Sequence, residues 1–351
     1  MKNLESEMSH QNLTDIYSII SELLSRNNSN HEMLHTGNAL YVKMSSTLLN
    51  CVQHLRSLLI NQKSVDKAYS LFHDEKSRQL FIWILRTNIA AVVTVGKNEM
   101  ERRCPYPTFV GQTHDRMLAK ASDKYREDSR YFYASNYKLL PCAENITSWI
   151  FEQYNLSGIC EVLHGETVIS GGGHYGDTTV WFADRVGKTG RVIVFEPSHN
   201  SYFKLKKTIK INHLSNYVTT VNSGLSDHKD ILYLTNLDSP AAQKITSTKT
   251  EESVHVVSLD DYCKENDEQH VDFIKMDIEG SELLALQGAR KTIQRCRPKL
   301  AICLYHKIGD LYRIPLYIHS LVPNYKFYIS LKMRSYGEYV LFALPPERAL
   351  C

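Results

Sequence analysis

The chain has 351 residues, of which 43% are hydrophobic, enough for one large core and an accessory domain. Its formal charge of +3 is nearly balanced, so bulk charge gives no reason to expect a nucleic-acid partner. The first residues are polar and acidic, unlike a signal peptide, and the most apolar stretch, 80–95, is interrupted by Arg86, Thr87 and Asn88, so no membrane span is expected. Eight scattered cysteines without C-x-x-C spacing favour reduced thiols and a cytoplasmic protein.

Apolar residues recur at helical spacing through the first hundred residues. The segments 13–24, 39–60 and 64–85 show this pattern, and the last of them reads as two shorter helices. Residues 101–130 are charged and contain Pro105 and Pro107, which is typical of a connection. We therefore predict a helical accessory region over 1–130, offering a surface for a homodimer, and a second domain over 131–351.

From Thr167 onward, short β-rich runs alternate with helix-length segments. This alternation, with nearly continuous apolar strands, predicts an α/β fold with a doubly wound parallel sheet. The last two runs are separated by a short polar turn containing Gly337, which predicts a C-terminal antiparallel hairpin. The nine runs that we expect to complete this one sheet are 167–170, 191–196, 217–222, 230–235, 254–259, 271–277, 299–305, 325–331 and 339–344.

A glycine-rich turn follows the first of these runs. Residues 171–176 have the spacing G-x-G-x-x-G, which lets a ligand approach the backbone amides at the start of a helix. Glu196 ends the next run, where a carboxylate can bind both hydroxyls of a ribose. Taken alone, the pattern fits NAD and S-adenosylmethionine equally, and a turn that binds nothing is a third alternative. The absence of a separate substrate domain after Glu196 favours a methyltransferase over an oxidoreductase.

The segment 271–293, VDFIKMDIEGSELLALQGARKTI, resembles the FkbM family of S-adenosylmethionine-dependent methyltransferases. Its residues 272–282 are similar to the most characteristic motif of that family, and the likeness extends over about 165–345. The resemblance implies a Rossmann-like, seven-stranded class I methyltransferase sheet. It also implies S-adenosylmethionine as the cofactor and O-methylation of a sugar or natural-product hydroxyl, so that the partner is a small-molecule or glycan substrate.

The chain departs from that family in the glycine turn. The family usually has Asp where this chain has Ser170, and Gly-Ala-Asn or similar at 172–174. Asp177 or Asp277 could compensate for the missing acid, and Ser170 is also the feature that favours a non-catalytic binding or scaffold protein. His174 is either a cofactor contact or an exposed loop histidine. The predicted cofactor-binding residues are Gly172, Gly173, His174, Gly176, Asp177, Glu196, Leu225 and Asp277.

Polar residues at the ends of two predicted strands are the candidate catalytic groups. Asp277 and Glu279 follow one strand and His306 follows another, and side chains at the carboxyl ends of neighbouring parallel strands can converge. His306 is the candidate general base because the ordinary pKa of histidine is near neutrality, and Asp277 could orient it. The alternatives are a helix start for the two acids and a core position for His306. A divalent metal held by these three residues is possible by ligand type but is not favoured.

Two further features have plain structural alternatives. Tyr131 and Tyr133 could form a lid over the cofactor, although ordinary aromatic packing is slightly favoured. Asp260 and Asp261 are expected to cap the helix that follows a strand.

Overall fold

The computed structural model describes residues 56–90, 125–128, 130–142, 144–235, 243–332 and 338–349. The chain divides into two compact units, Met1–Pro107 and Thr108–Cys351. The first unit contains helices α3 (Gln62–Leu71) and α4 (Glu75–Ala90). The helices predicted before residue 56 lie outside the described residues, and the homodimer and the boundary at 130 stay predictions. Within the described ranges, no helix combines the length and the hydropathy needed to cross a membrane.

A sheet of seven strands forms the centre of the second unit, which confirms the α/β class predicted from the pattern and the seven strands implied by the family resemblance. The strands run in the order β13-β14-β12-β11-β4-β5-β6. β6, β5, β4, β11 and β12 are parallel, and β14 is antiparallel to both β12 and β13. Their bounds are β4 Thr167–Gly171, β5 Arg191–Phe195, β6 Val218–Val221, β11 Phe273–Met276, β12 Lys299–Cys303, β13 Lys326–Leu331 and β14 Tyr339–Leu344.

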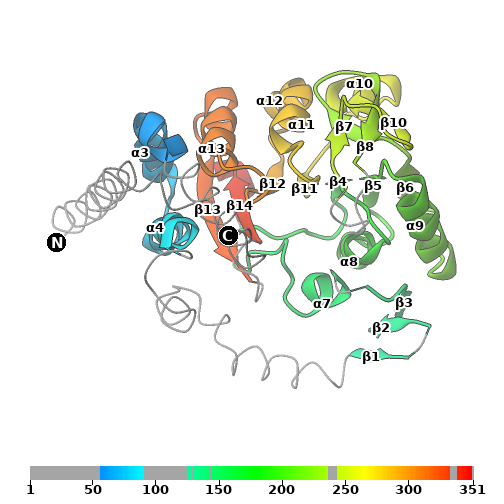
Figure 1. Ribbon diagram of the computed structural model, residues 1–351. Coiled ribbons are helices and arrows are strands. Elements are labelled where there is room, and N and C mark those ends of the chain that lie inside the picture. Colours follow the sequence, from blue (N-terminus) through cyan, green and yellow to red (C-terminus); the bar gives the residue numbers. More distant parts are fainter. Residues whose placement is uncertain are drawn as a thin grey trace, which may run out of the picture. The chain divides into compact units, whose positions relative to one another are not determined.

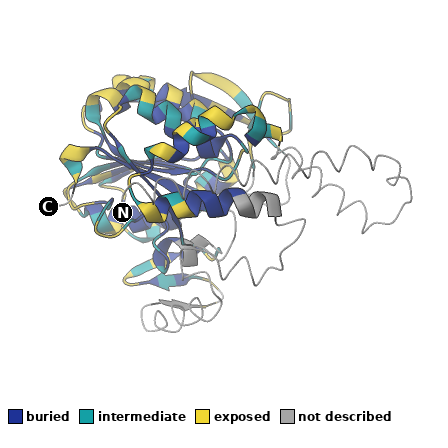
Figure 2. Cartoon of the chain, turned by 90° about the vertical axis from the view of Figure 1, so that its left-hand side faces the viewer, coloured by how far each residue is buried: buried dark blue, intermediate teal, exposed yellow. Residues whose placement is uncertain are grey.

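Helices cover both faces of this sheet, so its strands, except the edge strand β6, are buried along nearly their whole length (Figures 1 and 2). This explains why the strands are apolar at consecutive positions and not only at alternate ones. The helices of one side are α10 (Leu259–Glu265), α11 (Glu282–Gly288), α12 (Arg290–Cys296) and α13 (Asp310–Leu321). Helices α7 (Glu144–Trp149) and α8 (Asp177–Val186) lie on the other side, and α9 (His199–Ile211) contacts β6.

Two of the nine predicted runs belong to a second sheet, so their assignment to the main sheet is wrong. β8 (Asp230–Leu234) and β10 (Ser253–Ser258) join β7 (Gly224–Ser226) and β9 (Ile245–Thr246) in the order β7-β10-β8-β9. Asp230 and Ile231 are exposed, which a strand covered on both faces would not allow. A third, antiparallel sheet contains β1 (Tyr125–Glu127), β2 (Phe132–Ala134) and β3 (Tyr137–Leu139), and a short 3-10 helix spans Pro346–Arg348.

The helix after β10 is capped by a residue other than the predicted pair. Ser258 is the N-cap of α10, and its Oγ accepts a hydrogen bond of 3.1 Å from the amide of Asp261 while donating to that carboxylate at 2.7 Å. Asp260 instead accepts hydrogen bonds from the amides of Lys291 and Thr292 at the start of α12. These two acids therefore fix helix ends and do not face the cavity described below.

The strand order reverses at β4, which lies between β5 on one side and β11 on the other. In open α/β sheets this reversal opens a crevice at the carboxyl ends of the strands. The ends of β4, β5, β11 and β12 therefore position the candidate site.

Candidate active site

The glycine turn joins β4 to α8 through backbone conformations that only glycine adopts freely. The φ angles of Gly172 and Gly176 are +82° and +95°. A Cβ atom on Gly172 would collide with the carbonyl oxygen of Asp277, and one on Gly176 would lie 3.1 Å from Leu205. The glycines thus let the turn contact the end of β11 and let α9 pack against the start of α8.

The amides of this turn are already hydrogen-bonded within the protein. The N–H groups of Gly172 and Gly173 donate to the carbonyl oxygen of Phe195 at 3.0 and 3.1 Å, and that of Gly176 donates to the carbonyl of Gly173 at 2.8 Å. The amide of His174 donates to Glu196. The turn thus uses these four amides to hold its own shape against β5, and a direct contact between them and a ligand stays a prediction.

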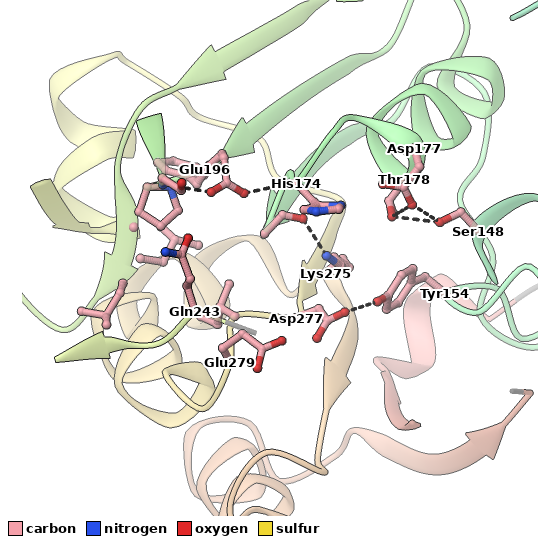
Figure 3. A pocket seen from close by; sticks show the side chains of 18 of the residues that line it. Ser148, Tyr154, His174, Asp177, Thr178, Glu196, Gln243, Lys275, Asp277 and Glu279 are labelled. Carbon is pink, nitrogen blue, oxygen red and sulfur yellow. Dashed lines mark hydrogen bonds between the residues drawn. The ribbon is translucent and has the colours of Figure 1, made fainter. Parts of the chain in front are cut away.

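A cavity of about 350 Å³ lies at the carboxyl ends of the strands, beside the turn (Figure 3). Its volume is in the range of small-molecule sites. Gly173 and Gly176 do not line it, and they shape the turn instead. The predicted cofactor-binding residues that do line it are Gly172, His174, Asp177, Glu196, Leu225 and Asp277.

The carboxylate of Glu196 is held by two backbone amides. Its Oε2 accepts a hydrogen bond of 2.7 Å from His174, and its Oε1 accepts one of 3.0 Å from Ser198. Burial raises the pKa of Glu196 to about 7, against the lowering effect of these amides and of the nearby charge of Lys275. Each oxygen can accept a further hydrogen bond, so the group fits the two hydroxyls of a ribose.

A buried lysine braces the turn from the neighbouring strand. The Nζ of Lys275 donates hydrogen bonds of 2.9 Å to the carbonyl oxygens of both Gly171 and Gly172. Ser170 lies opposite Lys275 in the register of β4 and β11, is fully buried and does not line the cavity. The sequence analysis missed Lys275, although a charge within an otherwise apolar strand is a readable signal.

Two tyrosines from distant segments hold Asp277. The Oη of Tyr154 donates to its Oδ2 at 2.6 Å, and the Oη of Tyr305 donates to its Oδ1 at 2.9 Å. Burial alone would raise the pKa of Asp277, but Lys275, His306 and the two phenols hold it below its ordinary value. Both tyrosines line the cavity and were missed. Tyr305 lies two residues after the end of β12, so its place near a strand end could have indicated it.

The structure brings the three candidate catalytic residues together, with the carboxylates of Asp277 and Glu279 beside the buried side chain of His306. The Nε2 atom of His306 lies 3.5 Å from Oδ1 of Asp277 and 3.4 Å from Oε1 of Glu279, while Nδ1 lies 2.8 Å from Oε1 of Glu282. Burial alone would lower the pKa of His306, but Glu279, Glu282 and Asp277 raise it to about 10. These carboxylates therefore favour the protonated imidazole in the ligand-free protein, and the catalytic role of His306 stays a prediction.

The remaining candidates occupy ordinary structural positions. Asp177 accepts a hydrogen bond of 2.5 Å from the Oγ of Ser148 at the edge of the cavity, and the ring of His174 stacks on Tyr175 at 3.8 Å. Tyr131 and Tyr133 pack edge to face at 6.2 Å, and neither lines the cavity. The arrangement of these two rings supports packing and gives no support to a lid.

A mixed seven-stranded sheet with a single antiparallel strand inside it, and a cavity at the reversal of strand order, define a Rossmann-like α/β fold. Residues 170–327 match the family model described as the methyltransferase FkbM domain. The resemblance inferred from the 272–282 motif is therefore confirmed by a match to the model of that family.

A solved structure with a TM-score above 0.5 shares this fold. The chain is similar to a structure titled methyltransferase FkbM from Methylobacillus flagellatus KT, with a TM-score of 0.56 and 20% identity over 82% of this chain. The match covers 60% of that structure, so the chain spans well under its full length. An O-methyltransferase from Bacillus cereus in complex with SAH is 14% identical, with a TM-score of 0.36, over 67% of this chain and 91% of that one. No curated protein matches the chain.

Proposed function

We propose that this chain is an S-adenosylmethionine-dependent methyltransferase that acts on a hydroxyl of a sugar or natural-product acceptor. The observation that carries this proposal is the position of Glu196, a strand-end carboxylate that lines the cavity beside the glycine turn. The FkbM domain match over 170–327 supports the same activity.

The residues around the cavity fit the parts of this cofactor. Glu196 would accept hydrogen bonds from the ribose hydroxyls. Leu225, Ile245 and Ile278 line the same cavity and offer an apolar surface for a purine ring. Asp177 and Asp277 are the acids that could hold the methionine ammonium, since Ser170 does not reach the cavity.

When bound, S-adenosylmethionine supplies an electrophilic methyl group on a sulfonium. The chain's own residues would hold the acceptor oxygen in line with that methyl group and receive a hydrogen bond from its hydroxyl. Asp277 and Glu279 line the cavity at the end of β11 and are the groups placed for this task. The rigid attachment of Asp277 to two tyrosines would fix the position of the acceptor.

Calorimetry with S-adenosylmethionine tests the proposal directly. We expect the wild-type protein to bind the cofactor and Glu196→Ala to bind it more than about tenfold more weakly, because hydrogen bonds to a charged group are lost. Glu268→Ala is a matched control, since Glu268 is equally buried but pairs with Arg191. No binding by the wild-type protein, or equal losses in both variants, would contradict the proposal.

A further inference from the structure

We infer that His306, Asp277 and Glu279 form a binding site for one divalent transition-metal ion, and that Glu282 positions the histidine for it. These four side chains lie at the ends of β11 and β12 and at the start of α11. The role of such an ion in methyl transfer would rest on the function proposed above. The site itself does not, because it follows from the donor atoms alone.

The separations of the Asp277 and Glu279 donor atoms from the His306 nitrogen suit a single ion. Metal–ligand distances of about 2.1 Å place two donors on one ion about 3.0 to 3.5 Å apart when they subtend an angle between 90° and the tetrahedral value. The Nε2 atom of His306 lies 3.5 Å from Asp277 and 3.4 Å from Glu279. Donor atoms of Asp277, Glu282 and His306 also lie within 4.8 Å of one another.

The imidazole is oriented as in a carboxylate–histidine–metal arrangement. Its Nδ1 lies 2.8 Å from Oε1 of Glu282, a fully buried side chain that also accepts a hydrogen bond of 2.9 Å from the amide of Ile278. A ring nitrogen held by a carboxylate on one side leaves the other nitrogen as the ligand. Glu282 is therefore a positioning residue, and Nε2 is the atom directed toward Asp277 and Glu279.

Buried polar atoms without a hydrogen bond of good geometry are a further observation at this site. The side chain of His306 is only 4% exposed, and among the residues that the structure describes its Nε2 has only the carboxylates of Asp277 and Glu279 nearby, at 3.5 and 3.4 Å, without a well-formed hydrogen bond to either. Oε2 of Glu282 also lacks a hydrogen bond within this described part of the chain. Leaving such atoms unsatisfied is costly in a folded protein, and a cation bound between them would remove the cost at Nε2.

The backbone of Glu279 has a strained conformation. Its φ angle is +55°, a left-handed conformation that a residue with a Cβ adopts rarely, and Gly280 follows at +96°. Such conformations are concentrated at functional sites because surrounding structure must enforce them. Here the conformation brings the Glu279 carboxylate to the histidine and to the cavity wall at once.

One imidazole with carboxylates is a donor set for Mn²⁺, Fe²⁺ or Zn²⁺. Asp277 and Glu279 line the cavity, so an ion between them would face the acceptor. It would bind the acceptor's hydroxyl oxygen and lower the pKa of that hydroxyl, with the proton passing to solvent.

Binding of Mn²⁺ alone to the full-length, EDTA-treated protein tests the site by electron paramagnetic resonance. We expect one Mn²⁺ per chain, and a dissociation constant raised at least about tenfold by Glu279→Gln and by His306→Gln. Glu279→Gln is the less disruptive variant, because Glu279 is partly exposed, so the test does not depend on a buried substitution. Loss of the three-dimensional fold in His306→Gln would leave Glu279→Gln to decide.

His228→Ala is the matched control. His228 lies at the surface, 2.7 Å from Asp227 and 3.6 Å from Asp230, and offers similar ligands outside the cavity. Unchanged Mn²⁺ binding in this variant supports the inference, and loss of binding there would overturn it, as would no stoichiometric Mn²⁺ binding by the wild type. Mn²⁺ binding without cofactor binding would uphold the metal site and reject the methyltransferase, and the reverse result would reject only the site.

Discussion

The hydroxyl of Tyr154 donates a hydrogen bond of 2.6 Å to the carboxylate of Asp277, although 123 positions separate the two residues. The hydroxyl of Tyr305 donates to the other oxygen of the same carboxylate. Asp277 is thus held from two directions at the end of β11. The geometry of the cavity wall depends on these phenols as much as on the motif residue itself.

Tyr154→Phe should lower the free energy of unfolding by about 1 to 3 kcal/mol, because a partly buried carboxylate loses a donor and keeps its charge. Tyr133→Phe is the control, since its hydroxyl donates at 2.9 Å to Asp128, which is exposed. Its effect should stay below about 1 kcal/mol. Urea denaturation of both variants measures the difference. Equal losses of unfolding free energy would show that the hydrogen bond to Asp277 stabilises the protein no more than an exposed one.

Gly172→Ala should be much more harmful than Gly158→Ala. Both glycines have positive φ angles, +82° and +72°, so both variants carry the backbone strain of about 1 to 3 kcal/mol. Only at Gly172 would the new Cβ also collide with a backbone oxygen, whereas nothing lies within 4 Å of it at Gly158. Thermal unfolding of the two variants checks this ranking, and similar melting temperatures would contradict the close approach of the turn to β11.

The stability of the ligand-free protein should depend on the ionisation of Glu196. Its pKa is raised from 4.5 to about 7 in the folded protein, mainly by burial. Folding therefore favours the protonated form, and stability falls as pH rises from about 4.5 to about 7, by roughly 3 kcal/mol. Glu196→Gln removes this contribution. Unfolding free energies at pH 5 and pH 8 test it, because the advantage of Glu196→Gln over the wild type should be larger at pH 8.

The parts of the site that could be predicted from the sequence are those formed by residues close together in the chain. The turn at 171–176 and the acid at 196 follow from short-range spacing, and the ends of β11 and β12 follow from the strand pattern. Tyr154 was not readable, because its partner lies in a distant segment. The ionisation of His306 was not readable either, since it depends on carboxylates from β11 and α11 that surround it only in the folded chain.

The assignment of strands to sheets shows the same limit. β8 and β10 are short β-rich runs like those of the main sheet, and their composition does not say which strands they pair with. Pairing is decided by partners elsewhere in the chain, and here β10 pairs with β7 and β8. The hydrophobic pattern therefore predicted that strands exist, while the second sheet that lines the cavity through Gly224 and Ile245 required the structure.

Comparing substitutions of Lys275 and Lys299 distinguishes two effects. One is the effect of the Lys275 charge on the glycine turn and Glu196, and the other is the loss of stability from removing any buried lysine. Both side chains are 2% exposed. Lys275 donates to the carbonyls of Gly171 and Gly172, whereas Lys299 donates to Glu166 at 2.5 Å and to the carbonyl of Glu161. Lys275→Met and Lys299→Met should each cost about 3 kcal/mol or more of stability, because buried partners are left unsatisfied.

Only Lys275→Met should change how Glu196 titrates, because the charge of Lys275 lowers the pKa of that carboxyl. Without the ammonium, the carboxylate would form at higher pH, and the cofactor would need a higher pH to bind. Calorimetric affinity for S-adenosylmethionine, measured from pH 6 to pH 9, should therefore show its midpoint displaced upward in Lys275→Met and unmoved in Lys299→Met. The same displacement in both variants would mean that general loosening of the sheet, and not the local charge, controls the ribose-binding carboxylate.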